Sequence, residues 1–355
     1  MSEFLAKRYA NASPYHPGEQ PTDRAYIKLN ANETSVAPSP KVKGALEDPA
    51  LYEGLGRYAD PHCMPLRTAV ARTCGVRPKE VFVGNGSDEV LGFIMQTFFE
   101  PGSRVCFPDV TYGFYRDYAT TFNLDWEEIP LREDFALDVE ALCETNRHAL
   151  IANPNAPTGL SVGRDEIARI ADAQPWRLVV LDEAYADFSG QTCIDLVAAH
   201  RNLIVVQTMS KSRNLAGAHI GYAIAQQDLV SDLNDVKFSF NPFNLSAPTM
   251  AIGIAALSDP AYYQGTVATT MRTRDASRKA LKDMGFAVLP SQTNFLFAHH
   301  PKLAAADWCR RLRAAGILTR HYSAPRIDDW LRVTVGTPNE MGTFLYETRR
   351  ILTKP

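Results

Sequence analysis

The sequence predicts an α/β fold, with a large domain built on a doubly wound, mostly parallel sheet and a smaller α/β domain after it. From about residue 40 to 265, short apolar segments of strand character alternate with stretches of helical character, which is typical of a doubly wound parallel sheet. After about residue 265 the alternation changes, and four further strand-like segments occur. A chain of 355 residues is long enough for more than one lobe.

We divide the chain into three parts. Residues 1–35 are rich in Pro, Asn and Gly and have little periodicity, so we expect an arm that lines the site rather than a domain. Residues 36–265 form the predicted large domain. Residues 266–355 form the predicted small domain, which part of the N-terminal segment joins in space. The strands expected in the small domain are residues 286–289, 294–297, 317–320 and 331–335, and a capping box at Thr337 and Glu340 predicts the start of the last helix.

The composition is that of an ordinary globular protein. The net charge is −3, so it gives no indication of nucleic acid or of an electrostatically held membrane as a partner. The six cysteines form no C-x-x-C pair and, with the eight histidines, no zinc-type spacing, so we expect free thiols and no metal. Free thiols are typical of a reducing compartment, and no apolar run reaches about 18 residues. We therefore expect a cytoplasmic protein with neither export nor a membrane span.

Lys211 is the first candidate for chemistry. It follows the strongly apolar segment 202–208, and ligands of a parallel α/β sheet bind in the crevice beyond the carboxyl ends of its strands. The alternative is a solvated surface lysine, which is the commoner case for a lysine taken alone. A second apolar segment, 177–182, ends in Asp182 and is followed closely by Tyr185, which favours the chemical interpretation.

A buried carboxylate such as that of Asp182 needs a cationic partner. The protonated ring nitrogen of pyridoxal phosphate is such a partner, and a carboxylate beside it strengthens the ring as an electron sink. A lysine can join the cofactor aldehyde through its amine and, once the substrate amine displaces it, move a proton between substrate and cofactor. Helix N-capping is the alternative for Asp182, and one aspartate can do both. The catalytic candidates are therefore Lys211, Asp182 and Tyr185.

The segment that follows residue 84 predicts a phosphate site. Residues 81–84 have strand character, and residues 85–99 continue as a helix. A helix N-terminus offers unpaired N–H groups and the positive end of the helix dipole, so Gly86, Ser87 and Asp88 are the predicted phosphate-binding residues. A nucleotide-binding fingerprint is excluded, because no glycine lies three residues after Gly86 and no G-x-x-x-x-G-K-[ST] occurs.

Seven segments together carry a family resemblance. They are residues 28–33, 57–61, 83–89, 153–159, 182–185, 210–212 and 331–336. With these segments in the family's order, the chain resembles the fold-type-I pyridoxal-phosphate aminotransferases of class II over nearly its whole length, and among them the histidinol-phosphate aminotransferases. The resemblance implies the fold-type-I architecture, pyridoxal 5'-phosphate as the cofactor and a homodimer.

The resemblance also implies cofactor contacts. Tyr112 matches the aromatic residue that stacks on the pyridine ring, although a tyrosine in this setting is often simply core. Tyr185 matches the residue that tunes the phenolic oxygen, and Ser210 lies in the matched turn beside Lys211. Tyr58 matches a tyrosine that crosses the dimer interface to the cofactor phosphate of the partner.

The chain departs from the family pattern at two cofactor positions. Many relatives have asparagine directly before the last proline of segment 153–159, whereas this chain has Ala156 there and Asn155 one place earlier. Either Asn155 reaches the phenolic oxygen or Tyr185 makes that contact alone. Most relatives have a phosphate-binding arginine where this chain has His219, and histidine cannot form the bidentate fork. We expect weaker phosphate binding unless Arg213 or Tyr58 compensates.

Four residues are implied in substrate binding. Tyr15 matches a tyrosine that contacts the substrate phosphate, with an anchor for the arm as the alternative, and Asn32 resembles a substrate-facing position at the domain junction. Arg332 lies among apolar neighbours, where its charge needs an anion. Arg320 matches a second family arginine, and two arginines suit a phosphate dianion. Pairing with Asp328 or Asp329 is the alternative for either arginine.

The function implied is ping-pong transamination, in which glutamate donates an amino group and imidazole acetol phosphate accepts it to give L-histidinol phosphate. An aromatic or broad-range aminotransferase would use the same chemistry with another pocket. A threonine-phosphate-type decarboxylase shares the motifs and breaks a different bond. A degenerate, non-enzymatic relative is the remaining alternative, against which Lys211, Asp182 and Tyr185 argue.

Overall fold

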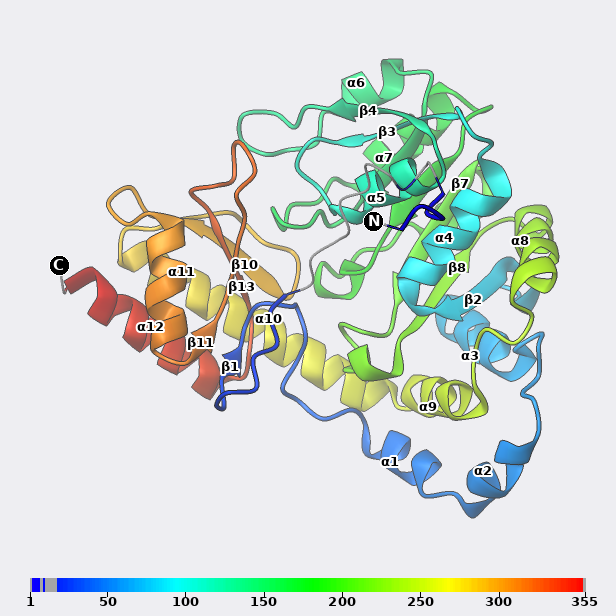
Figure 1. Cartoon of the computed structure of the whole chain (residues 1–355), viewed down its shortest axis with the longest axis horizontal. Helices are drawn as coiled ribbons and strands as arrows, with labels where there is room; N and C mark the ends of the chain where they lie inside the picture. The colour runs from blue at the N-terminus through cyan, green and yellow to red at the C-terminus, as the bar shows by residue number, and fades with distance from the viewer. Residues whose placement is uncertain (1, 7–8, 10–17, 354–355) are drawn as a thin grey trace.

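A seven-stranded mixed sheet forms the centre of the larger lobe in the computed structural model, which describes residues 2–6, 9 and 18–353 (Figure 1). The strand order is β2-β8-β7-β6-β5-β3-β4, and β8 alone runs antiparallel to its neighbours. The prediction of a mostly parallel, doubly wound sheet is therefore confirmed. The strands are β2 (Val81–Asn85), β3 (Arg104–Pro108), β4 (Asp125–Ile129), β5 (His148–Ala152), β6 (Val179–Asp182), β7 (Leu203–Thr208) and β8 (Ile220–Ile224).

Helices cover both faces of this sheet (Figure 1), and its central strands are therefore buried on both sides. Alternate residues of β7 enter two different hydrophobic clusters, with Leu203 and Val205 in one and Ile204 and Val206 in the other. Strands that are buried on both faces have continuous apolar sequences. These apolar segments are the signal from which the strands were predicted. The helices of the larger lobe are α1 (Pro40–Leu46), α2 (Pro49–Glu53), α3 (Met64–Cys74), α4 (Gly86–Phe98), α5 (Phe114–Thr121), α6 (Val139–Glu144), α7 (Arg164–Ala173), α8 (Gln227–Phe240) and α9 (Ala247–Leu257).

The smaller lobe contains a four-stranded antiparallel sheet of order β12-β13-β10-β9. Its strands are β9 (Ala287–Val288), β10 (Phe295–His299), β12 (Arg320–His321) and β13 (Leu331–Thr334). Helices α11 (Ala305–Ala314) and α12 (Pro338–Thr353) pack on it through Trp308 and Phe344. The predicted capping box of α12 is present, since Thr337 N–H donates to Glu340 Oε2 (2.7 Å) and Glu340 N–H donates to Thr337 Oγ1 (3.3 Å).

One strand expected from the sequence is wrong in detail. Residues 317–320 were expected to form a single strand, but β11 (Ile317–Leu318) pairs in parallel with β1 (Ile27–Lys28), whereas Arg320 and His321 pair with β13. The chain changes sheets at Thr319, so two short strands replace one. Because β1 and β11 pair, the N-terminal segment lies against the smaller lobe.

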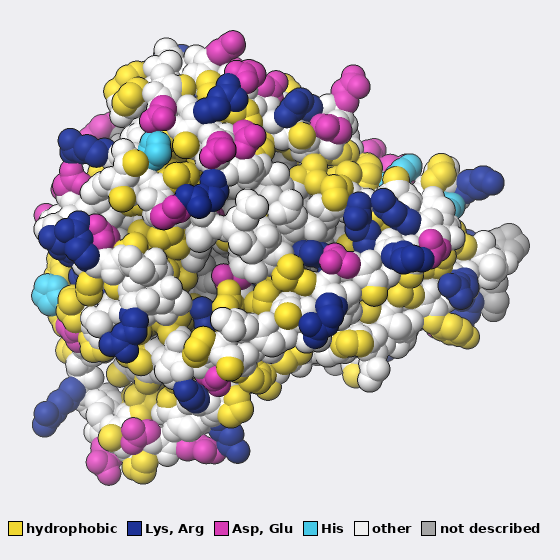
Figure 2. Space-filling model, turned by 180° about the vertical axis from the view of Figure 1, so that it is seen from behind, with side chains coloured by type: hydrophobic (Ala, Val, Ile, Leu, Met, Phe, Trp, Pro, Cys, Tyr) yellow, Lys and Arg dark blue, Asp and Glu magenta, His cyan; other side chains and the backbone are white. Residues whose placement is uncertain are grey.

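The domain boundaries near residues 35 and 265 stay predictions. Helix α10 (Pro260–Asp283) runs without a break across position 265 and extends from the larger lobe into the smaller one in Figure 1. Lysine, arginine, aspartate and glutamate side chains are interspersed over the face shown in Figure 2. Within the described ranges, the helices are all too short or too polar to cross a bilayer.

Strand β8 lies very close to the backbone at the start of α4. Gly221 of β8 lies opposite Gly84 of β2, and a Cβ atom on Gly221 would lie 2.3 Å from the carbonyl carbon of Gly86 and from the backbone nitrogen of Ser87. Backbone atoms cannot move aside as a flexible side chain can. The start of α4 is therefore fixed by the absence of a side chain at Gly221.

We predict that Gly221→Ala lowers the free energy of unfolding by about 1–3 kcal/mol, because the added methyl group forces α4 away from the sheet. Urea unfolding of purified protein measures the change. Gly92→Ala is the matched control, since a Cβ at this position within α4 meets nothing within 4 Å and alanine favours a helix by about 1 kcal/mol. Equal stability of the two variants would contradict the close contact.

Candidate active site

A cavity of about 240 Å³ lies at the carboxyl ends of β2, β5, β6 and β7. The register of the sheet brings these ends to one edge, although β2 (Val81–Asn85) and β7 (Leu203–Thr208) are far apart in the chain. Most of the predicted cofactor and catalytic residues line this cavity, namely Gly86, Ser87, Asp88, Tyr112, Asp182, Tyr185, Ser210, Lys211 and His219.

The N-terminus of α4 opens on this cavity. Gly86, at φ +79°, begins the helix, and Asn85 before it makes no side-chain capping hydrogen bond to the first turn. The first N–H groups of this 13-residue helix are therefore available to an anion. The carboxylate of Asp88 binds no anion itself, since it is an acceptor and already takes a hydrogen bond from the Tyr112 hydroxyl (2.9 Å). Gly86 and Ser87 are left as the anion-binding part of the predicted cradle.

His219 lies against this helix start in a left-handed conformation (φ +53°). A Cβ atom on Gly86 would lie 2.4 Å from His219 Cε1, so the imidazole ring occupies the space above the glycine. His219 Nδ1 is buried and has no hydrogen-bond partner. A buried ring nitrogen without a partner, beside unpaired helix N–H groups, fits a site that holds a phosphate.

Arg213 does not take the place of the missing arginine. Its guanidinium stacks on Tyr263 at 3.6 Å from the ring centroid and lines a different cavity, with Cys74 and Gln207. At the start of α4, the groups left for a phosphate are therefore backbone N–H groups and the imidazole of His219.

Asp182 ends β6 and is 6% exposed. Its carboxylate accepts hydrogen bonds from Ala184 N–H (3.0 Å) and from the Tyr115 hydroxyl (3.2 Å). Burial raises the pKa of Asp182 from 3.8 to about 6, although these two hydrogen bonds and the charge of Lys211 act in the opposite direction. A carboxylate held in this way gains from a cation in the cavity, and the protonated nitrogen of a pyridine ring fits that requirement.

Tyr185 is the remaining candidate for contact with a phenolic oxygen. Its hydroxyl accepts a hydrogen bond from Asn32 Nδ2 (2.7 Å), and its ring packs edge-on against Phe295. Burial raises the pKa of Tyr185 above its ordinary value, while Arg332 and the Asn32 hydrogen bond lower it. Asn32, at φ +54°, is fixed by Thr334, so the smaller lobe positions this contact.

Asn155 does not occupy the position expected of it. Its amide nitrogen donates to the Val110 carbonyl (2.9 Å) and to Thr158 Oγ1 (3.0 Å), and its oxygen accepts from Thr111 Oγ1 (2.7 Å). Its side chain does not line the 240 Å³ cavity, whereas Ala156 does. Because these hydrogen bonds hold the amide beside its own turn, we expect Tyr185 rather than Asn155 to contact the phenolic oxygen.

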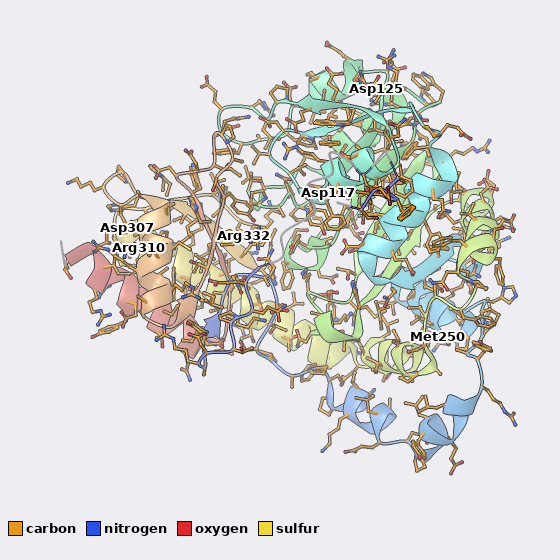
Figure 3. The ribbon with its side chains drawn as sticks, in the orientation of Figure 1. Asp117, Asp125, Met250, Asp307, Arg310 and Arg332 are labelled. Carbon is orange, nitrogen blue, oxygen red and sulfur yellow. The ribbon has the colours of Figure 1, made fainter. Side chains whose placement is uncertain are left out.

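A second cavity, of about 530 Å³, adjoins the first and leads between the lobes. Tyr112, Tyr185 and Lys211 line both cavities, so a ligand in one lies next to a ligand in the other. The second cavity also contains the predicted substrate residues Asn32, Arg320 and Arg332. Figure 3 shows Arg332 on the side of the smaller lobe that is nearer to the larger one, away from Asp307 and Arg310 on α11.

Arg320 and Arg332 are direct partners across the antiparallel pair β12–β13. Arg332 Nη2 donates to the Asn30 carbonyl (2.8 Å), and Nε is buried without a partner. No described carboxylate lies within ion-pair distance of Arg332, and Asp329 pairs with His299 instead (2.9 Å). Like charges opposite one another on a sheet are destabilising, so an anion in this cavity would relieve their repulsion.

The comparisons with known proteins show the family of this chain. A family model described as "Aminotransferase class I and II" matches residues 24–346. The histidinol-phosphate aminotransferase of Clostridium acetobutylicum is 43% identical over 97% of this chain and 98% of the relative. Histidinol-phosphate aminotransferase 1 of Bradyrhizobium diazoefficiens is 41% identical over 99% of this chain and all of the relative. The chain belongs to the histidinol-phosphate aminotransferase family of class I and II aminotransferases.

Solved structures place this aminotransferase in the same fold. The histidinol-phosphate aminotransferase of Sinorhizobium meliloti, solved in complex with pyridoxal-5'-phosphate, superposes with a TM-score of 0.83 at 26% identity, over 93% of this chain and 92% of that chain. An aspartate aminotransferase variant of Thermus thermophilus shares the fold at a TM-score of 0.83 and 19% identity, over 99% of this chain and all of that chain. The prediction of the fold-type-I architecture is thereby confirmed.

Of the other predicted site residues, one cannot be placed and one lies away from the cavities. Tyr15 lies outside the described residues. Tyr58 is 83% exposed, stacks on Phe243 with ring centroids 4.4 Å apart, and lines neither cavity.

Sequence reasoning missed several residues of the site. Tyr115 donates to Asp182, and its position three residues after Tyr112, where a helix begins, could have indicated a shared face. Arg326 reaches from the smaller lobe to Asp109 (2.5 Å) and to the Leu131 carbonyl (3.0 Å) of the larger one. It lies in a loop without periodicity, and no sequence signal indicated this contact.

Asp182→Asn gives a test of the buried carboxyl group. Because the folded protein binds the Asp182 proton more tightly than the unfolded chain does, its ionisation costs stability as pH rises from about 4 to about 6. In cofactor-free protein, we predict that the stability of the variant relative to the parent rises by about 2 kcal/mol between pH 4.5 and pH 7.5. Urea unfolding at both pH values measures it. Asp235→Asn, on the exposed side of α8, should show no such change. A stability difference that is independent of pH would contradict burial as the cause of the raised pKa.

Proposed function

We propose that this chain transfers the amino group of L-histidinol phosphate to 2-oxoglutarate, and the reverse, with pyridoxal 5'-phosphate as cofactor, as a step of histidine biosynthesis. The observation that carries this proposal is the placing of Arg320 opposite Arg332 in the cavity that Lys211 and Tyr185 also line. Two neighbouring guanidinium groups suit a phosphate dianion. The names of the full-length relatives support the same substrate.

The cavity beside α4 is the proposed place of the cofactor. When bound, pyridoxal phosphate supplies an aldehyde that exchanges amines and a ring that accepts an electron pair. Gly86 and Ser87 offer backbone N–H groups to the phosphate, and the orphaned imidazole of His219 and the hydroxyl of Ser210 face the same space. Tyr112 lies at the position proposed for stacking on the ring.

Three side chains carry out the proton chemistry in this proposal. Lys211 would hold the cofactor aldehyde through its amine and, once the substrate amine has displaced it, would move the proton from the α-carbon of the substrate to the cofactor. Asp182 holds the proton on the ring nitrogen, and that cation in turn stabilises its buried carboxylate. Tyr185, oriented by Asn32, donates to the phenolic oxygen.

The arginine pair binds the acidic end of both substrates. L-histidinol phosphate presents a phosphate and no carboxylate, whereas glutamate presents carboxylates. Arg332 contacts the rings of Phe295 and Tyr322 and the Asn30 carbonyl. These uncharged groups hold the guanidinium in position, and its positive charge is available to bind a substrate anion. The same two guanidinium groups therefore serve two anions of different shape.

The partner in this proposal is a second copy of the chain, and the expected location is the cytoplasm. Exposed large apolar side chains concentrate in residues 46–64 and 238–243, with Tyr52 80%, Tyr58 83% and Phe240 71% exposed. Exposed apolar surface of this kind marks an interaction surface. In a homodimer, Tyr58 would reach the cofactor phosphate of the partner and complete the site around His219.

The substrate is tested by kinetics on cofactor-loaded protein with 2-oxoglutarate as the acceptor. We predict that kcat/KM for L-histidinol phosphate exceeds that for L-phenylalanine by roughly a hundredfold or more, because only the former engages both arginines. Equal values would identify an aromatic aminotransferase, and release of carbon dioxide from O-phospho-L-threonine would identify a decarboxylase. If no amine changes the cofactor absorption band, the catalytic roles of Lys211 and Asp182 are wrong.

The role of Tyr58 is tested by sedimentation equilibrium and by cofactor titration. We predict a dimer, and a dissociation constant for pyridoxal phosphate that rises roughly tenfold in Tyr58→Phe, since one hydrogen bond to a charged phosphate is lost. Tyr52→Phe, in the same exposed region, is the control and should bind the cofactor as the parent does. A monomeric parent, or equal binding by both variants, would refute the shared site.

A further inference from the structure

The geometry points to Tyr322 as a positioning residue that holds the two arginines in register for a phosphate group without bringing a negative charge of its own. This inference rests on the proposed function of the arginine pair and adds a residue that sequence reasoning did not single out. Tyr322 follows β12 directly and lines the 530 Å³ cavity together with Arg320 and Arg332.

The ring of Tyr322 is shared by the two guanidinium groups. The Arg320 Cζ atom lies 5.6 Å from its centroid, and the Arg332 Cζ atom lies 5.8 Å from the same centroid. Both distances are within the range of cation–π attraction. One aromatic side chain therefore contacts two cations that face each other across β12–β13.

Among the described residues, Arg332 is held by neutral groups. Its contacts are the Tyr322 ring, the Phe295 ring at 5.6 Å and the Asn30 carbonyl at 2.8 Å. A carboxylate in the place of these groups would fix the guanidinium equally well, but it would compete with the substrate anion. Aromatic faces and a carbonyl oxygen restrict the side chain while leaving its positive charge for a ligand.

The Tyr322 ring is itself supported by the core of the smaller lobe. It meets Phe297 edge-on, with centroids 6.5 Å apart and an interplanar angle of 73°. Phe297 is fully buried and stacks on Trp330 at 5.1 Å. The position of the ring is thus set from β10 and from the loop before β13, which makes it a rigid surface for the two arginines.

A rigid pair of guanidinium groups favours a dianion over a single carboxylate. A phosphate has enough oxygens for both groups, whereas a carboxylate satisfies one fork well. Tyr322 should therefore affect the binding of phosphate-bearing ligands more than the proton transfer at Lys211. This difference separates positioning from a general contribution to folding.

The test compares Tyr322→Leu and Tyr322→Phe in the cofactor-loaded enzyme. We expect Tyr322→Leu to raise KM for L-histidinol phosphate roughly tenfold with kcat within about twofold of the parent, because two cation–π contacts are lost. Tyr322→Phe keeps the aromatic face and should rescue KM to within about twofold. Tyr346→Leu, at a 66% exposed position on α12, controls for the loss of an aromatic ring elsewhere.

Calorimetry with inorganic phosphate as the ligand measures the affinity of the arginine pair without any turnover. This measurement keeps the test of Tyr322 separate from the test of the proposed function. If the parent does not turn over L-histidinol phosphate, the proposed function fails, and the phosphate affinities of the parent and the two variants still test Tyr322. Weaker phosphate binding by Tyr322→Leu alone supports the inference. An unchanged affinity and KM in Tyr322→Leu, an equal loss in Tyr322→Phe, or a fall in kcat alone would overturn it.

Discussion

The register of the seven-stranded sheet is the constraint on which the candidate site depends. Strands β2, β5, β6 and β7 run in the same direction, so their carboxyl ends lie along one edge although β8 separates β2 from β7. This edge brings the start of α4, Asp182 and Lys211 around one cavity. The absence of a side chain at Gly221 lets β8 approach the backbone at Gly86, and thereby sets where the N–H groups of α4 point.

The two cavities differ in the charge of the protein groups proposed to bind a ligand. In the inner cavity the carboxylate of Asp182 is deeply buried, and its raised pKa reflects a cost that a cation can remove. In the outer cavity two arginines face one another, and an anion can remove their repulsion. Asp182 is thus preorganised for a cation, and the arginine pair is preorganised for an anion. We propose that the cofactor ring and the acidic end of the substrate carry those charges.

The two lobes are linked through the residues that orient the site. Asn32, between β1 and the larger lobe, donates to Tyr185 and is fixed by Thr334 of β13. Arg326 reaches from the loop before β13 to Asp109 and to carbonyl groups of the larger lobe. Because the contacts that shape the outer cavity come from both lobes, any change in their relative position would alter the arginine pair and Tyr185 together.

The sequence by itself determined the parallel sheet and the inner cavity, because buried strands read as apolar runs and place the residues that follow them at one edge. Lys211, Asp182 and the glycine at the start of α4 were predicted for that reason. Only the tertiary structure decided that Asn155 stabilises its own turn, that residues 317–320 divide between two sheets, and that Tyr322 lies beside both arginines. These outcomes depend on contacts between distant segments, and a side chain's competing hydrogen-bond partners cannot be identified until those segments have been placed in space.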